Sequence, residues 1–219
     1  MPILSGCLTT PEPNQPLRVE LLFEVDEIGE TLEIGDESIN INQFKFSIDR
    51  FNLIAIDSTL VLESKDDFDS IIFNYSDTFT DVNLVLGVQL GFEDVSGFEG
   101  YEMFTRPVSD FDSINDQDFF GSEETYSFIV KGEYNGEEFT YNSSLSFDKF
   151  QQFDMVQVGQ SRETLVIAKS ILISDVFIDE SEQQIINPTD PDNEVLINSN
   201  FEENLTIEAY SLSRFVDND

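Results

Sequence analysis

The chain has 219 residues, the size of one large all-β or α+β domain or at most two small ones, and its 45 acidic and 10 basic side chains give a net charge of −35. A surface this acidic repels phosphate backbones and anionic lipids, so binding to nucleic acid or to a membrane surface is close to excluded. The sequence has no histidine, which removes imidazole-based hydrolases and imidazole-ligated zinc, copper and haem.

Residues 1–16 are predicted to form a tether ahead of the folded domain. Leu4-Ser5-Gly6-Cys7 resembles the lipobox of bacterial lipoproteins, in which small residues precede a cysteine that becomes acylated. Cys7 is the single cysteine and cannot form an intrachain disulfide. Only Met1-Pro2-Ile3 precedes the box, so either the sequence begins inside a signal peptide or the match is accidental. A chance buried thiol is the alternative to lipidation.

Alternating apolar and polar residues begin at Leu17 and predict a series of strands. A turn is predicted at residues 27–29, and the alternation slips near Asn42-Gln43 and again near Asp49-Arg50, so residues 39–57 form two strands or one bulged strand. Asn135-Gly136 predicts a tight hairpin with a type I′ turn. The predicted strands are 17–25, 39–57, 59–63, 81–90, 125–134, 137–147, 153–158 and 163–172.

The C-terminus is predicted to be helical. Asp190-Pro191 is typical of a helix start, and residues 195–212 place apolar side chains at spacings near four. The alternative is two short strands, because residues 205–210 also alternate. No helices separate the earlier strands, so the predicted fold is all-β: an antiparallel β-sandwich of about eight or nine strands with a C-terminal helix, in one domain over residues 17–219.

Calcium is the predicted metal, because hard oxygen ligands are abundant and a cation relieves repulsion among them. The densest candidate loop contains Asp110, Asp112, Asp116 and Asp118. This loop lacks the glycine and the terminal glutamate of an EF-hand. Residues 66–69 form a second acidic group, and a third at residues 190–194 is better explained as a helix cap. The alternative for all of them is a solvated acidic loop.

The sequence predicts a protein that binds and does not catalyse. Acids fall on the polar side of strands or in loops, where water keeps them ionised, and nothing in the sequence places one in a long apolar run. Glycoside hydrolysis needs two positioned carboxylates beside an aromatic cleft, and the chain has no tryptophan. Its 21 phenylalanines are interpreted as core packing, with a ligand-stacking platform as the alternative. The acidity fits either a salt-adapted protein or docking on a basic partner.

Four segments resemble the β-sandwich lipoproteins secreted by Bacteroidota and, more distantly, the methanobactin-associated periplasmic protein family. They are Phe44-Lys-Phe-Ser-Ile-Asp-Arg-Phe-Asn-Leu, Leu84-Val-Leu-Gly-Val-Gln-Leu, Thr125-Tyr-Ser-Phe-Ile-Val-Lys-Gly-Glu-Tyr and the ending from Asp175-Val-Phe to Ile186-Asn-Pro-Thr-Asp-Pro-Asp-Asn-Glu. In the methanobactin-associated proteins copper is held by residues that include histidine and a modified tryptophan. This chain has neither, so copper binding does not carry over. Asp-Ser-apolar or Asp-Ser-Thr triplets place Bacteroidota-type O-glycosylation signals at Ser58, Ser70 and Ser113.

The expected function is that of a non-enzymatic, lipid-anchored protein of the bacterial cell envelope. It would be an outer-membrane lipoprotein on the periplasmic or cell-surface face, acting as a binding or assembly module. Its partner would be another envelope protein, such as an outer-membrane protein. Two alternatives stay open: a pilin-like subunit that polymerises by strand addition, and a calcium-dependent hydrolase that uses only carboxylates.

Overall fold

A computed structural model describes residues 17–55, 61–63, 70–77, 86–92, 97–109, 114–157, 163–205 and 209–214. Its elements in chain order are β1 (Leu17–Asp26), β2 (Thr31–Ile34), β3 (Glu37–Ile48), β4 (Arg50–Ala55), β5 (Val61–Glu63), β6 (Ile71–Ser76), β7 (Leu86–Phe92), β8 (Gly97–Thr105), η2 (Gln117–Phe119), β9 (Phe128–Tyr134), β10 (Glu137–Ser143), β11 (Phe147–Gln157), β12 (Glu163–Leu172), η3 (Ile173–Phe177), β13 (Ile178–Asp179), β14 (Gln184–Ile185), η4 (Pro191–Asn193), α1 (Glu194–Asn204) and β15 (Ala209–Arg214).

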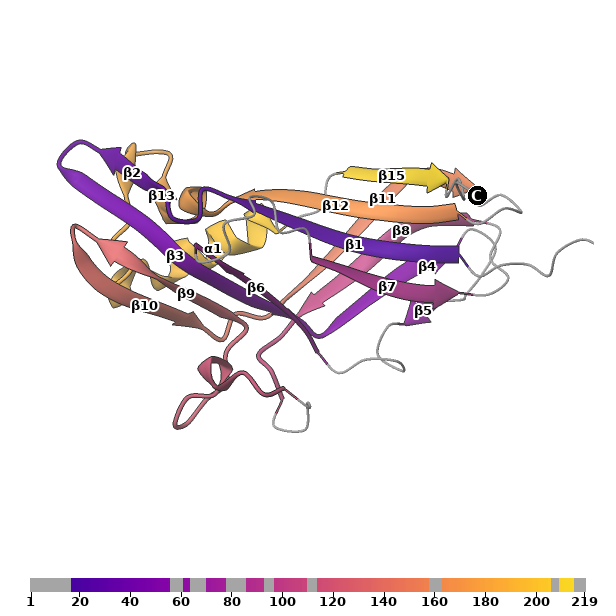
Figure 1. Cartoon of the computed structure of the whole chain (residues 1–219), viewed down its shortest axis with the longest axis horizontal. Coiled ribbons are helices and arrows are strands. Elements are labelled where there is room, and N and C mark those ends of the chain that lie inside the picture. The colour runs from indigo at the N-terminus through magenta and orange to yellow at the C-terminus, as the bar shows by residue number, and fades with distance from the viewer. Residues whose placement is uncertain are drawn as a thin grey trace, which may run out of the picture.

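The strands form several sheets, and the predicted all-β class with a C-terminal helix is confirmed (Figure 1). One sheet has the order β15-β12-β1-β7, a second β10-β9-β3-β2 with β6 also on β3, and a third β11-β8-β4-β5. The pairs are antiparallel except β1 with β12, which is parallel and was not expected from a purely antiparallel sandwich. Figure 1 shows β2, β3, β9, β10 and α1 gathered at one end of the elongated molecule.

The slip in the alternation of β3 is a bulge. The register of β3 against β9 shifts between Ile41 and Gln43, as the sequence predicts near Asn42-Gln43. Ile39 and Ile41 face the core before the bulge, and Phe44, Phe46 and Ile48 face it afterwards. The extra residue therefore keeps every large apolar side chain on one face, and it leaves polar side chains of the strand on the other.

Phenylalanine builds the core, as the packing interpretation predicts. Phe23 of β1 and Phe73 of β6 both contact Phe46, with ring centroids 5.0 and 4.7 Å away, and Phe23 and Phe46 are fully buried. Phe128 and Phe201 stack with centroids 4.6 Å apart, which seats α1 on the sheet of β9 and β10. One continuous aromatic core thus joins the first sheet, the second sheet and the helix.

The helix is shorter than the sequence predicts. The side chain of Asp190 accepts a hydrogen bond from the Asp192 amide at 3.0 Å and so caps η4, the 3-10 turn that leads directly into α1. The α-helix ends at Asn204, however, and residues 209–214 form β15, paired antiparallel with β12. The sheet partner decides this outcome, because residues 209–214 gain backbone hydrogen bonds with β12 along the strand. In the part of the chain that the structure describes, no helix is long and apolar enough to cross a bilayer.

Candidate functional site

Two lysines lie on the outer face of the second sheet, at positions where the alternation of the strands places polar side chains. Lys45 of β3 is only 5% exposed, and Lys131 of β9 is half-buried. Gln43, the register partner of Lys131, stands two residues before Lys45 on the same strand. The bulge of β3 thus sets Lys45 and Lys131 close together on the face opposite the aromatic core.

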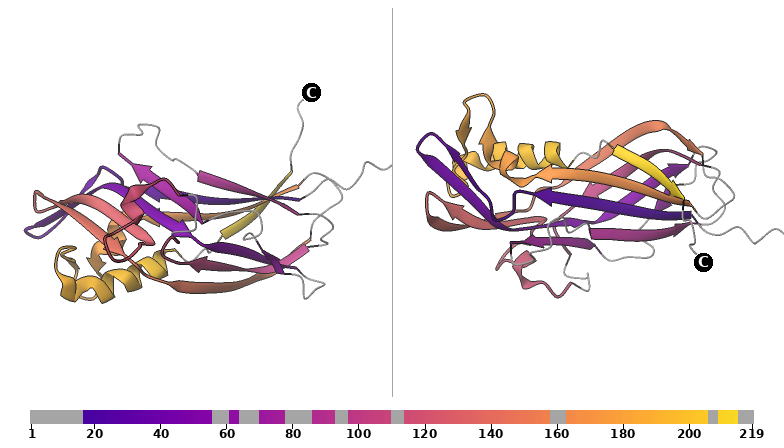
Figure 2. Two further views of the ribbon diagram at one scale, coloured as in Figure 1. Left: turned by 90° about the horizontal axis from the view of Figure 1, so that it is seen from below. Right: turned by 45° about the horizontal axis from the view of Figure 1, so that its top comes forward.

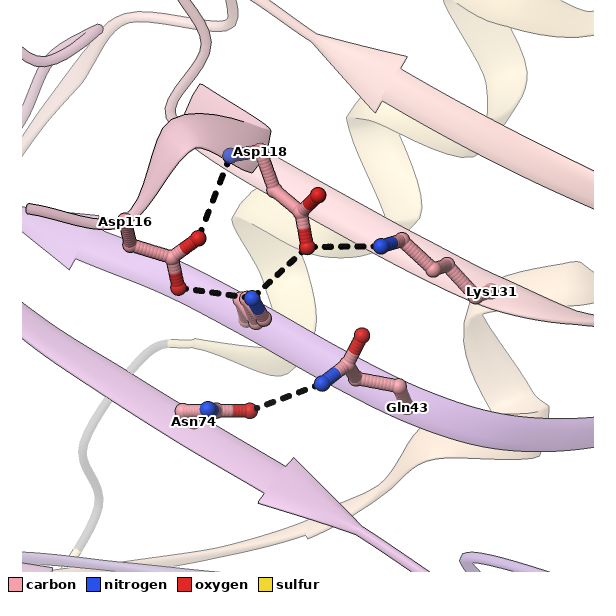
Figure 3. Close-up of polar contacts among 6 residues, drawn as sticks. Gln43, Asn74, Asp116, Asp118 and Lys131 are labelled. Carbon is pink, nitrogen blue, oxygen red and sulfur yellow. Dashed lines mark hydrogen bonds and ion pairs between the residues drawn. The ribbon is translucent and has the colours of Figure 1, made fainter. Parts of the chain in front are cut away.

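Two aspartates cover these lysines from the loop around η2. Lys45 Nζ donates to Asp116 Oδ2 at 2.6 Å and to Asp118 Oδ2 at 2.7 Å, and Lys131 Nζ donates to the same Asp118 oxygen at 2.6 Å (Figure 3). The Asp118 amide also donates to Asp116 Oδ1 at 3.1 Å, which holds the two carboxylates in one short turn. The four side chains form a closed network of two cations and two anions.

The loop carrying these aspartates is fixed by a small second core. Phe119 is fully buried and packs with Val108 and Ile129 on the same outer face as Lys45. Backbone hydrogen bonds from Val108 to Tyr126 and from Tyr126 to Phe119 close the loop on itself. The loop therefore covers Lys45 on the outer face of the sheet. Its ion pairs with the lysines help to hold it there.

The electrostatics of the network favour fully charged groups. Hydrogen bonds from Lys131 and then Lys45 hold the pKa of Asp118 below its usual value. Burial alone lowers the pKa of Lys45, but hydrogen bonds and charge from Asp116 and Asp118 outweigh it and raise the pKa above its usual value. An amine held this way stays protonated at neutral pH, so it is a poor nucleophile or base.

Half of the predicted calcium loop thus has another role. Asp116 and Asp118 already face two ammonium groups, so a calcium ion there would have to displace lysine. Among the described residues, no group of three or more acids is arranged to hold a metal. Asp110 and Asp112 lie outside the described residues, and calcium binding by the four aspartates stays a prediction.

The two lysines were not predicted as site residues, although the sequence contains a signal for them. Lys45 stands between Phe44 and Phe46 at a polar position of the alternation, and Lys131 follows the apolar run Phe128 to Val130. A lysine within a strand of this kind needs an anion nearby, because an unpaired ammonium is costly to bury. Searching for that anion among the acidic loops would have linked Lys45 to a partner.

The other predicted site residues are mostly outside the described part of the chain. Cys7, Ser58 and Ser113 are among them, so lipidation and two of the glycosylation sites stay predictions. Ser70 is described and lies half-buried immediately before β6. Its glycosylation also stays a prediction.

A second polar group lies where β1 meets η3, and it departs from the expectation that all acids are well solvated. Asp175 is half-buried between Ser174 and Val176. Burial, followed by the charges of Glu27 and Glu180, raises the pKa of Asp175 above its usual value. Ser174 Oγ donates a hydrogen bond to Glu27 Oε2, and Glu27 has a positive φ of 67° in the turn after β1.

The raised pKa of Asp175 gives its substitution a pH-dependent effect. The folded protein binds this proton more tightly than the unfolded chain does, so ionisation of Asp175 removes stability as pH rises above the unfolded value of about 3.9. We expect Asp175→Asn to melt at a higher temperature than the parent at pH 7. The difference should shrink as pH falls towards 4. Thermal melts across this range test it, and a lower melting temperature for the variant at pH 7 would contradict the assignment.

Basic side chains elsewhere are also engaged within the chain. Arg106 forms an ion pair with Asp148, and Lys149 pairs with Glu202 at 2.9 Å. The Arg50 guanidinium lies 4.0 Å from the centre of the Phe104 ring. Together with Lys45 and Lys131, these are the basic residues whose side chains the structure describes. None of these five described side chains therefore stands as an isolated positive charge on the surface.

No protein-family model matches the sequence, and no curated protein matches it either. Among solved structures, the fold is similar to that of "MbnP from Methylosinus trichosporium", with a TM-score of 0.46 and 8% sequence identity. The similarity covers 83% of this chain and 86% of that chain. At this level it describes a loosely shared arrangement of strands and carries no inference about activity.

Proposed function

We propose that the protein is a non-enzymatic binding module that docks a protein partner in the bacterial envelope, where a lipid on Cys7 anchors it. The observation that carries the proposal is the distribution of charge. Four of the five described basic side chains, Lys45, Lys131, Arg106 and Lys149, are paired with acids of the same chain. Because the 45 acidic side chains far outnumber the 10 basic ones, ion pairs within the chain can engage only a minority of the acids, and the rest are available to an outside partner.

The network around Lys45 supports a structural role for the candidate site. The charged groups of this network are directed at one another, and Lys45 is only 5% exposed. Such a network fixes a loop and leaves little capacity for substrate chemistry. The partner protein would then bind to the exposed strands, sheet edges and loops around the network.

Purification from native membranes in mild detergent tests the function. We expect a complex of defined stoichiometry that dissociates as salt is raised, because charge drives the association. When the protein is expressed behind a lipoprotein signal peptide, Cys7→Ser should release it from the membrane fraction and remove the mass of the acyl chains. Unchanged membrane association of that variant would contradict the anchor.

The carboxylate-only hydrolase is the second candidate, and the raised pKa of Asp175 is the observation in its favour. A panel of glycan and ester substrates, assayed with and without calcium, separates the two. We expect no turnover above background. Recovery of the protein only as a monomer, with turnover that Asp175→Asn abolishes, would replace the binding module with the enzyme.

A further inference from the structure

Strand β10 is the end strand of the second sheet, and among the described strands it pairs only with β9. Asn135 and Gly136 have φ values of 52° and 78°, so the β9–β10 hairpin has a two-residue turn of the type I′ kind. The residues flanking such a turn, Tyr134 and Glu137, are a hydrogen-bonded pair. Since hydrogen bonding alternates along an antiparallel pair, the backbone groups that point away from β9 are those of Glu138, Thr140 and Asn142.

Apart from the charges of Glu137 and Glu138, this edge lacks the features that usually prevent strand addition. Edge strands are commonly protected by proline, lysine, a bulge or short length. β10 has seven residues without proline or lysine, and its register with β9 is unbroken from Glu137 to Ser143. Glu138, Thr140 and Asn142 are all exposed. The outward backbone donors and acceptors are therefore accessible to an added strand.

Helix α1 packs against β10 next to its free edge (Figure 2). Tyr141 Oη and Ser143 Oγ of β10 donate to Asn198 Oδ1 at 2.9 and 2.7 Å, which fixes this flank of the helix beneath the strand. Val195 lies three residues before Asn198, on the same flank, and is 82% exposed. An added strand would place alternate side chains over this flank, where Val195 offers an apolar contact.

The acidic side chains around the edge of β10 favour a basic partner. Glu137 and Glu138 are the charged residues of β10, Glu133 is the register partner of Glu138, and Glu194 begins the helix below; all four are exposed. A second copy would bring an equally acidic edge on another chain of charge −35, so like-charge repulsion opposes self-association. Opposite charge on the incoming strand would instead be stabilising.

We propose that the free edge of β10 binds an extended, basic segment of a partner protein by strand addition. Alternate apolar side chains of that segment face the Val195 flank of α1, and its lysine or arginine side chains face solvent beside the glutamates. This inference rests on the proposed binding function and specifies its surface and partner chemistry. Backbone hydrogen bonds provide affinity and the alternating side chains provide specificity.

A synthetic peptide of alternating lysine and valine is the probe. Binding is measured by fluorescence anisotropy, and the site by hydrogen exchange. Thr140→Pro removes one outward N–H but no β9–β10 hydrogen bond, so the hairpin is expected to fold, and melting temperature checks this. Thr140→Val is the matched control, because it changes the side chain and keeps the N–H. A peptide of the same sequence with alternate backbone nitrogens methylated has equal charge but cannot pair.

We expect the peptide to slow exchange at Glu138, Thr140 and Asn142. Thr140→Pro and N-methylation should each weaken binding about tenfold or more, while Thr140→Val should bind as the parent does. Glu137→Lys with Glu138→Lys should lower affinity for the basic peptide and raise it for an alternating glutamate–valine peptide. Equal binding by the parent and Thr140→Pro, or protection confined to other strands, would assign the binding to bulk charge and overturn the proposal.

The native complex separates this inference from the function on which it rests. Loss of the complex in Thr140→Pro supports the edge as the docking site. A complex that survives Thr140→Pro refutes the edge but keeps the binding module. Absence of any complex refutes the binding module itself. A homodimer that Thr140→Pro dissociates would assign the edge to a second copy and refute a basic partner.

Discussion

Replacing Phe46 by alanine is expected to lower the free energy of unfolding by about 4 kcal/mol. Phe46 is fully buried and stacks on Phe73 and Phe44, with ring centroids 4.7 and 5.2 Å away. It also meets Phe23 of the first sheet edge to face. The substitution removes transfer free energy and leaves a cavity between two sheets that cannot easily close. For a domain whose total stability is about 5–15 kcal/mol, this loss is severe.

Urea unfolding measures the effect, and Phe150→Ala is the matched control. Phe150 is 63% exposed, so its truncation should change stability by less than about 0.5 kcal/mol. The two variants remove the same atoms, and the difference between them isolates burial. A loss below about 1 kcal/mol for Phe46→Ala would show that the aromatic core does not hold the two sheets together.

The long strands could be predicted because their alternation is strong. Leu17 to Val25 alternates except at Leu22, and this segment forms most of β1. Asn135-Gly136 gave the hairpin, because few other residue pairs adopt two positive φ values. The bulge in β3 was also visible, as a one-residue change of phase near Asn42.

Other strands gave too little local signal. β2 has four residues, alternately exposed and half-buried. β8 contains Gly97 and Gly100, which count against a strand by propensity. In the structure Gly100 is needed, since a Cβ there would lie 2.7 Å from the Gln151 carbonyl oxygen of β11. The parallel pairing of β1 with β12 joins segments 146 residues apart, as in the pair Arg18 and Thr164, and alternation contains no information about such a partner.

Only the acidic half of the candidate site could be predicted, for a similar reason. The density of acids between residues 110 and 118 marked the loop as a cation site, and the loop does bind cations at Asp116 and Asp118. The cations are ammonium groups of Lys45 and Lys131, which are distant in sequence. Composition identifies the need for a positive charge, whereas only the fold determines which positive charge is brought there.

Asparagine at both Asp116 and Asp118 is expected to destabilise the protein by about 3 kcal/mol at neutral pH. The double variant leaves Lys45, only 5% exposed, without its two carboxylates, and an uncompensated buried charge is costly. Adding Lys45→Met removes that charge and keeps the volume of the side chain, so the triple variant should recover much of the loss. Lys149→Met is the control, because the Lys149–Glu202 pair is more exposed and should contribute less than about 1 kcal/mol.

The pH dependence of the double variant follows from the lowered pKa of Asp118. Ionised Asp118 contributes fully to the free energy of unfolding above its unfolded-state pKa of about 3.9. This contribution is lost as pH falls through the lower pKa that Asp118 has in the folded protein. The gap between the parent and the double variant should therefore close in acid. A calcium site makes different predictions: the parent would gain more melting temperature from calcium chloride than from sodium chloride of equal ionic strength, and Lys45→Met would rescue nothing. Rescue by Lys45→Met, with equal effects of the two salts on the parent, assigns Asp116 and Asp118 to the lysines.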